Sequence, residues 1–218
     1  MPLSSVVGAQ SIVKPGVCTS STRPASPYDG QVIYETDTDR AMVWNGTGWV
    51  VLSTGRANSL GLDLIKTQTI GTAVSSATVS DVFSSAYDNY QIIVDGGTSS
   101  NTSFNLQLGS TTSGYYYASH YSQYTTTTPL ALSSTTGASF VEAGRCSTTG
   151  NNMNCYLYGP FLSKKTGFRS QSTDYDTTGF LVTTSGFLND TNSYTSFVVK
   201  PSSGTLTGGT ISVYGYAK

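Results

Sequence analysis

The chain has 218 residues, of which only 11% are charged, and its formal net charge is −1. This balance provides no basic patch that could neutralise phosphates, so it argues against nucleic acid as a partner. The abundant threonine and valine and the 15 tyrosines favour short β-strands and exclude a disordered chain.

The N-terminal sequence, MPLSSVVGAQ, lacks the basic start and the continuous apolar core of a secretory signal. No apolar run in the chain approaches the roughly 18 residues that a membrane-spanning helix needs. We therefore expect a protein that is made in a cytoplasm and does not insert into a membrane.

Residues 1–27 show no sustained hydrophobic period, and Pro15, Pro24 and Pro27 oppose a helix. We expect an extended docking arm that becomes ordered on contact with a partner. A disordered tail is the alternative interpretation of the same pattern.

Residues 28–53 contain three short apolar runs separated by turn sequences, Thr-Asp-Thr-Asp and Asn-Gly-Thr-Gly. This pattern predicts a three-stranded β-meander, which is too small to be stable by itself and must dock on something larger. We expect Tyr34, Trp44 and Trp49 to be its packing and docking residues. The small polar residues at 54–61 predict a linker.

The turn between the first two runs contains Asp37 and Asp39 close to Glu35. Carboxylates at this spacing could ligate Ca²⁺ or Mg²⁺ through oxygen atoms. We favour a turn in which the aspartates bond the local backbone, because a calcium loop needs more carboxylates and a distal glutamate. The sequence predicts no metal and no cofactor.

Residues 62–218 show many short strand patterns separated by turn residues, and no stretch has a convincing helical period. We predict an all-β protein in which the meander is followed by a jelly-roll-like β-sandwich of eight to ten strands, with helix near absent. Eleven segments are candidates for these strands, at residues 64–70, 77–83, 90–95, 104–108, 115–124, 139–143, 153–158, 165–172, 180–184, 196–200 and 210–216. We expect the last of these to be tucked into a sheet.

The densest aromatic segment is the predicted strand at 115–124. Its odd-numbered tyrosines would share one face, and Tyr116 and His120 would share the other. We favour one face as core or subunit interface, while Tyr116, His120 and Tyr124 are the candidates for contact with a receptor or a sugar. The polar loops at 96–103, 125–137 and 146–152 are candidate contact loops.

Three cysteines give an odd count. Cys146 and Cys155 are spaced so that they could face each other across a hairpin, but we expect thiols in a protein made in a reducing compartment. The single histidine, His120, rules out a zinc site built on histidines.

The chain offers little for catalysis. Asp174 and Asp176 could be compared with the carboxylate pair of a glycosidase, but such pairs come from different strands, and we favour a solvated loop. His120 is the only general base of its kind and has no nucleophile motif beside it. We expect no enzymatic activity.

Three segments carry a resemblance to known proteins. Residues 27–52, with Gly-Gln-Val-Ile-Tyr-Glu-Thr-Asp-Thr and a Trp-Asn-Gly-Thr-x-Trp end, resemble a unit found near the N-termini of tail, neck and head fibres of tailed bacteriophages. Residues 82–90, Val-Phe-Ser-Ser-Ala-Tyr-Asp-Asn-Tyr, are similar to the opening of the distal β domains of phage structural proteins. Residues 208–216, Gly-Gly-Thr-Ile-Ser-Val-Tyr-Gly-Tyr, resemble their closing strand.

The resemblance implies a virion component, assembled in the host bacterial cytoplasm as a homotrimer, whose N-terminus docks on another virion protein. The domain at 62–218 would face outward and attach to the host surface, where a glycan is the candidate partner. Two alternatives stay open, which are a head-decoration or head-fibre protein on the capsid, and a carbohydrate-binding module of a cellular protein.

Overall fold

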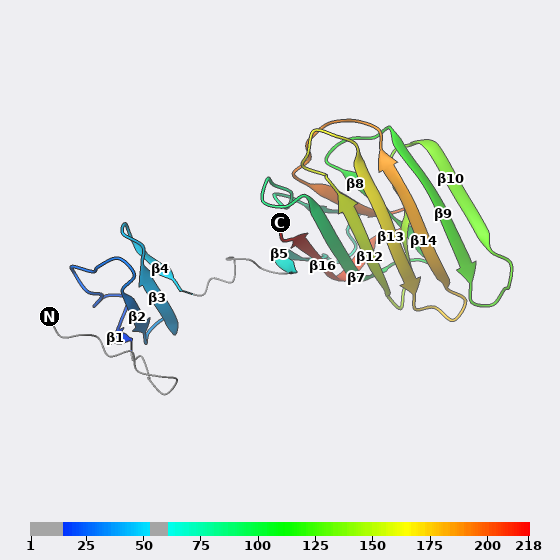
Figure 1. The fold of residues 1–218 in the computed structure, drawn as a ribbon. Helices are drawn as coiled ribbons and strands as arrows, with labels where there is room; N and C mark the ends of the chain where they lie inside the picture. Colours follow the sequence, from blue (N-terminus) through cyan, green and yellow to red (C-terminus); the bar gives the residue numbers. More distant parts are fainter. Residues whose placement is uncertain (1–14, 53–60) are drawn as a thin grey trace. The chain divides into compact units, whose positions relative to one another are not determined.

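The computed structural model describes residues 15–52 and 61–218, and these residues form strands and turns without any helix (Figure 1). The chain divides into two compact units, Met1–Asn58 and Ser59–Lys218. In the part of the chain that is described, no helix long and apolar enough to cross a membrane is found. The all-β prediction is confirmed.

The N-terminal unit is a single four-stranded sheet. Its strands are β1 (Gly16–Cys18), β2 (Val32–Glu35), β3 (Arg40–Trp44) and β4 (Trp49–Val51), in that spatial order. The three antiparallel strands β2, β3 and β4 are the meander that the turn sequences predicted. Asn45 makes the second turn by accepting hydrogen bonds from the backbone N–H groups of Thr47 and Gly48, at 3.1 and 2.9 Å.

Strand β1 corrects the boundary of the predicted arm at 1–27. It pairs parallel with β2, and the Thr36 N–H donates to the Cys18 carbonyl at 3.0 Å. Its three residues are too few to show a hydrophobic period, so only the pairing identifies them as a strand. The first fourteen residues of the arm and residues 54–60 of the predicted linker lie outside the described residues.

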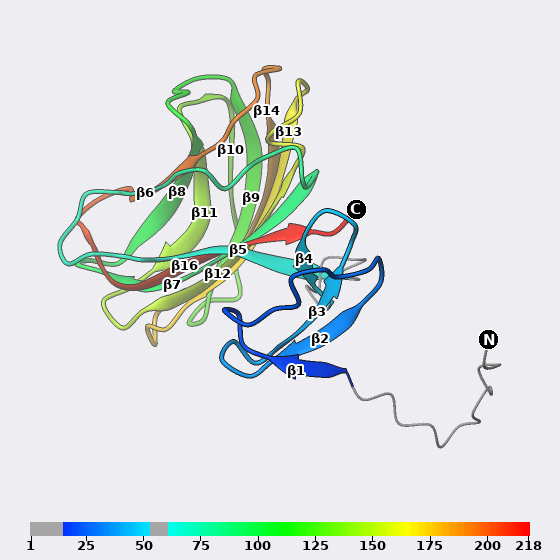
Figure 2. The ribbon, with the colours of Figure 1, turned by 90° about the vertical axis from the view of Figure 1, so that its left-hand side faces the viewer.

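The second unit is a β-sandwich of an eight-stranded and a four-stranded sheet (Figures 1 and 2). The larger sheet has the order β10-β9-β14-β13-β12-β7-β16-β5, and the smaller sheet has the order β11-β8-β15-β6. The strands are β5 (Leu62–Thr69), β6 (Ala77–Val79), β7 (Asn89–Thr98), β8 (Thr102–Leu108), β9 (Tyr115–Gln123), β10 (Leu130–Gly137), β11 (Phe140–Cys146), β12 (Asn151–Tyr158), β13 (Thr166–Asp174), β14 (Phe180–Leu188), β15 (Phe197–Pro201) and β16 (Leu206–Tyr216).

The predicted sandwich is confirmed, and each predicted strand of this unit has a counterpart, whereas the jelly-roll arrangement stays a prediction. Strand β10 was missed, because it lies within the segment 125–137 that the sequence predicted as a contact loop. None of its residues is buried, so it has no alternation of apolar and polar residues. The closing strand β16 lies inside the larger sheet, between β7 and β5, as expected.

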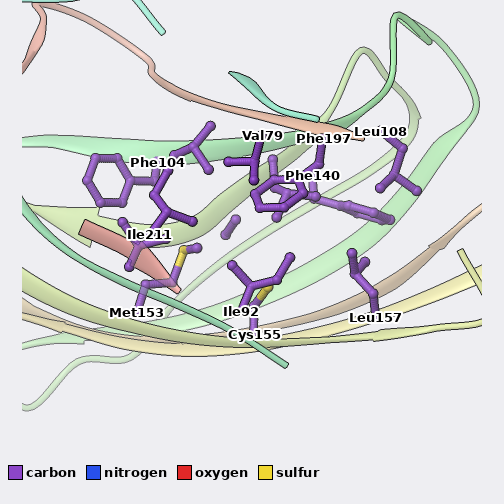
Figure 3. Packing of buried hydrophobic residues seen from close by; sticks show 14 of the residues in the cluster. Val79, Ile92, Phe104, Leu108, Phe140, Met153, Cys155, Leu157, Phe197 and Ile211 are labelled. Carbon is purple, nitrogen blue, oxygen red and sulfur yellow. The ribbon is translucent and has the colours of Figure 1, made fainter. Parts of the chain in front are cut away.

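The core fills the space between the two sheets (Figure 3). The alternating residues of β12, Met153, Cys155 and Leu157, point inward from the larger sheet and are fully buried. Phe140 reaches in from the smaller sheet and stacks on Phe168 with ring centroids 4.1 Å apart. This interdigitation of side chains from both sheets is what orders the strands of the sandwich.

The segments 82–90 and 208–216, which carry two of the resemblances, pack against each other. Tyr90 is the register partner of Gly215, and the Tyr87 ring lies directly over that glycine. A Cβ atom at position 215 would lie 2.4 Å from the Tyr87 ring, so any residue other than glycine would clash with that ring. Tyr87 also packs edge-on against Tyr90 at 6.0 Å.

The cysteines are thiols, as expected, and a tight turn closed by the Ser147–Gly150 bridge does join their two strands, but the cysteines do not face each other across it. Cys146 ends β11 in the smaller sheet, and Cys155 lies in β12 of the larger sheet. Both are fully buried, and burial raises the pKa of the Cys146 thiol to about 11. The pKa of Cys155 is also raised by its burial.

Thiol reactivity provides a direct check on this packing. At about pH 8, we expect Cys18, which is half-buried, to react with Ellman's reagent in the native protein. Cys146 and Cys155 should react only after unfolding in guanidinium chloride, because they are inaccessible and protonated. Equal reaction rates for all three thiols in the native protein would contradict this packing.

Candidate interaction surfaces

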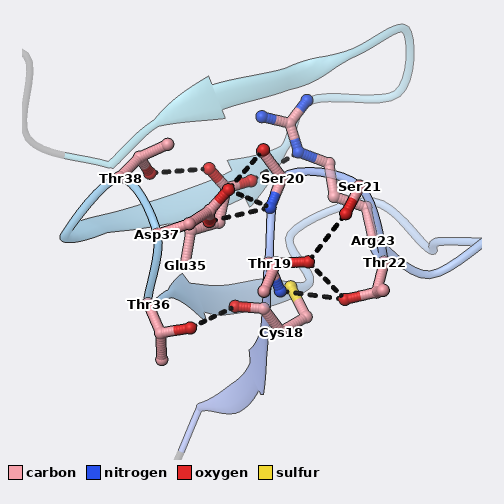
Figure 4. A network of polar contacts seen from close by, with 10 residues as sticks. All are labelled: Cys18, Thr19, Ser20, Ser21, Thr22, Arg23, Glu35, Thr36, Asp37 and Thr38. Atoms are coloured by element: carbon pink, nitrogen blue, oxygen red, sulfur yellow. Dashed lines mark hydrogen bonds and ion pairs between the residues drawn. The ribbon is translucent and has the colours of Figure 1, made fainter.

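A polar network fixes the loop after β1 to the turn after β2 (Figure 4). The backbone N–H and the hydroxyl of Ser20 donate to the Asp37 carboxylate at 2.9 and 2.5 Å. The Arg23 Nε–H donates to Glu35, to which the Thr38 hydroxyl also donates at 2.8 Å. Because Glu35 is buried, this ion pair neutralises a charge that would otherwise be costly.

The aspartates of this turn serve the local structure. The hydrogen bonds from Ser20 lower the pKa of Asp37, and the hydrogen bond from Arg23 lowers the pKa of Glu35. Asp39 has a positive φ of 54° and accepts a hydrogen bond from the Tyr34 hydroxyl. Across residues 15–52 and 61–218, no group of three or more His, Cys, Asp or Glu side chains is arranged to hold a metal ion.

Acid should weaken the N-terminal unit. Because the pKa values of Asp37 and Glu35 are lowered on folding, their contribution is complete above the unfolded pKa of about 4 and is lost as the pH falls below it. Both tryptophans lie in this unit, so the urea midpoint measured by tryptophan fluorescence should fall between about pH 5 and about pH 3. The Asp37→Asn variant should reduce this dependence. A midpoint independent of pH in the wild-type protein would contradict the role of the network.

One face of the small sheet holds the only core that this unit has in the described residues. Ile33 and Met42 are register partners and are both buried. Trp44 and Trp49 lie on the same face, opposite each other on β3 and β4, with their rings edge-on at 5.7 Å. The tryptophans thus extend the core, although both stay partly exposed.

The opposite face of the small sheet is apolar and open. Val17, Tyr34 and Ala41 form one register row across it, and Val32, Val43 and Val50 form the next row. None of these side chains is buried, and Val17 is 69% exposed. Leu52, which follows β4 along the same edge, is 53% exposed. We call this set of seven residues the open face.

The structure therefore divides the three predicted docking residues between two faces. Tyr34 lies on the open face, whereas Trp44 and Trp49 belong to the face with the core. The valines of the open face were not named from the sequence. The alternation along β2 and β3 indicates them, but a strand with apolar residues on both faces gives no sign of which face stays open.

The three predicted receptor residues do not form one site. Tyr116 and His120 both point outward from β9, but they are four residues apart, which is roughly 13 Å along a strand. Tyr116 stacks on Phe187 of β14 with centroids 5.0 Å apart, and a hollow of about 300 Å³ adjoins this pair. Tyr124 is 49% exposed and donates its hydroxyl to the Asp174 carbonyl at 3.2 Å. The inward face of β9 is core at Tyr115 and Tyr117, as expected.

A second hollow of about 220 Å³ lies on the same outward face, between β12 and β13. It was not predicted from the sequence. Its lining includes Tyr156, Tyr158, Arg169 and Gln171. The alternation along β12 places both tyrosines outward, so half of the site could have been found. The pairing of Tyr156 with Arg169 depends on the strand order, which periodicity does not show.

The aspartates considered as a catalytic pair organise a turn. Asp174 is buried and accepts hydrogen bonds from the backbone N–H groups of Asp176 and Phe180, both at 3.2 Å. Burial raises the pKa of Asp174, whereas hydrogen bonds from Thr178 and Asn101 lower the pKa of Asp176. These backbone bonds favour the structural interpretation of the pair.

No protein family matches this sequence, and no curated protein matches it either.

Proposed function

We propose that the chain is a structural fibre protein of a tailed bacteriophage virion, without enzymatic activity. Its N-terminal unit docks on another virion protein, and its β-sandwich faces outward and attaches the particle to the host surface. The chain assembles as a homotrimer. The resemblance of residues 27–52 to phage fibre units is the sequence argument for this proposal.

The observation that carries the proposal is the open face of the N-terminal unit. A sheet of this size buries little apolar surface by itself, and here only Ile33 and Met42 are buried hydrophobic residues in the described part of the unit. The open face exposes a continuous apolar surface to water, and this exposure is unfavourable. Contact with a virion protein would bury that surface and add a second buried face to the small core of the unit.

The edges of the sandwich support association between copies. Strand β10 ends the larger sheet, so no described strand pairs with its outer edge. Leu130 and Leu132 of this strand are 43% and 38% exposed. Because an apolar edge strand readily pairs with another chain, packing of identical copies side by side would cover it.

The head-decoration alternative rests on the same docking unit, because the resembling sequences also occur in head fibres. Copy number separates the two functions. Quantitative gels or mass spectrometry of purified virions should give on the order of a dozen copies per particle for a symmetric tail or neck fibre. Hundreds of copies per particle would support the capsid decoration and contradict the fibre. Absence of the chain from the particle would contradict both functions.

A further inference from the structure

The hollow between β12 and β13, which lie side by side in Figure 1, is built as a small polar site. Its volume of about 220 Å³ is below the roughly 300–1,000 Å³ of pockets for drug-sized ligands, so it suits one ring-sized group. Tyr156 and Tyr158 come from β12, and Arg169 and Gln171 come from β13. All four side chains point outward, away from the core.

Hydrogen bonds already hold one wall of the hollow in place. The side-chain Nε2 of Gln91 on β7 donates to the side-chain Oδ1 of Asn154 at 2.8 Å, and the Asn154 Nδ2 donates to the Tyr156 hydroxyl oxygen at 3.2 Å. Because the Tyr156 oxygen accepts this bond, its O–H proton is available to donate to a ligand. A side chain fixed by such a second layer of bonds loses little freedom when it binds a ligand.

An exposed aromatic ring borders the hollow. Tyr158 is 44% exposed, and its neighbour across the strands, Gly167, has no side chain to cover it. A Cβ atom at Gly167 would lie 3.3 Å from the Tyr158 ring. The pKa of Tyr216 is raised by burial and then by Tyr156 and Tyr158, so a third phenol lies close by. Rings of this kind provide a large flat contact area at low entropic cost.

Arg169 is the one charged residue among those that line the hollow. Arg169 is exposed and has no ion-pair partner among the described residues. No Asp or Glu points outward from β9, β12, β13 or β14, because Asp174 at the end of β13 is buried inside, but on β7, beside β12, Asp95 is exposed on the same face, opposite Asn152. Lys165 adds a second positive charge beside β13, with its Nζ 5.3 Å from the Phe187 ring. Because β12 separates Asp95 from Arg169, which forms no ion pair, the guanidinium is available to an anionic ligand, and its planar fork matches a carboxylate.

Building on the attachment function proposed above, we propose that this hollow binds a carboxylate-bearing sugar of an acidic host-surface glycan. Arg169 pairs with the sugar carboxylate, Tyr158 stacks on the ring, and Tyr156 and Gln171 bond its hydroxyl groups. The apolar hollow beside Tyr116 and Phe187 lies on the same face and receives a neighbouring sugar of the chain. The two hollows are separated by about two strand spacings, or roughly 10 Å.

The test uses the purified full-length protein and immobilised oligosaccharides that contain uronic or sialic acids, each beside its carboxyl-reduced counterpart. We expect binding to acidic members of the set, and loss of about tenfold or more in affinity on carboxyl reduction or in Arg169→Gln. Tyr158→Ala should weaken binding to a similar degree. Arg40→Gln in the N-terminal unit and Tyr175→Ala, an exposed tyrosine after β13, are the matched controls and should bind as the wild type does.

Three results would overturn the site. These are binding to no acidic glycan, equal binding to the reduced glycans, and unchanged binding by both variants. Loss of the oligomer in Tyr158→Ala, measured by sedimentation, would also overturn it by identifying the face as a contact between copies. Incorporation into virions is measured separately, so the fibre function can stand when the glycan site fails.

Discussion

Replacing Phe140 with alanine should destabilise the sandwich more than any other single truncation considered for it, by about 3–5 kcal/mol. The Phe140 ring is fully buried, lies edge-on to Tyr115 at 4.8 Å and stacks on Phe168 of the opposite sheet. Truncation would remove both contacts and leave a cavity that two rigid sheets cannot close. In a unit of this size, the loss should lower the melting temperature by about 10 °C.

The control for Phe140→Ala is the same substitution at Phe187. That ring also stacks, on Tyr116, but it lies on the outward face and is 36% exposed. We expect its removal to cost less than about 1 kcal/mol, because water already contacts the ring. Equal losses in the two variants, measured by calorimetry, would show that the sandwich is not stabilised chiefly by its inner faces.

Removing residues 1–52 should abolish incorporation into virions while leaving the melting temperature of the sandwich unchanged. The sandwich has its own core, and its contacts fall within a unit that begins at Ser59. The open face, by contrast, lies entirely within the deleted segment. Purified particles would be probed for the shortened and the complete chain by immunoblotting. A shortened chain that still enters particles would contradict docking through the N-terminal unit.

A matched pair of point variants sharpens this prediction. Val50 on the open face is 40% exposed, and Leu181 on the outward face of β14 is 43% exposed. Aspartate at either position should change stability by no more than about 0.5 kcal/mol, because neither residue is in a core. Val50→Asp should reduce incorporation sharply, since it places a charge in an apolar contact, whereas Leu181→Asp should not. Similar incorporation of the two variants would argue against the open face as the docking surface.

The sequence predicted most of the fold because its strands are half-buried and alternate. In β12, Met153, Cys155 and Leu157 alternate with polar and aromatic residues, and the period of two was enough to identify the strand. Strands that lack this contrast were missed. β1 has three residues, and β10 has no buried residue, so only their pairing with β2 and β9 defines them.

The candidate surfaces were harder to predict, because they depend on which strands become neighbours. Tyr156 and Arg169 come together through the antiparallel register of β12 and β13, which no local pattern encodes. The tyrosine-dense segment at 115–124 drew attention first, yet Tyr116, His120 and Tyr124 are spread along β9 and beyond. A high local density of one residue type predicts a shared site only when the residues lie on the same face of the sheet and in the same register row across neighbouring strands.

The central claim is that the N-terminal unit docks on the particle while the sandwich faces outward. Labelling intact virions with gold-conjugated antibodies against each unit, followed by electron microscopy, tests this claim most directly. We expect gold from the sandwich antibody at the outer ends of tail or neck fibres, and no gold from the antibody against the N-terminal unit until particles are disrupted. Gold from the N-terminal antibody at the outer ends of the fibres, or no label on virions with either antibody, would contradict it.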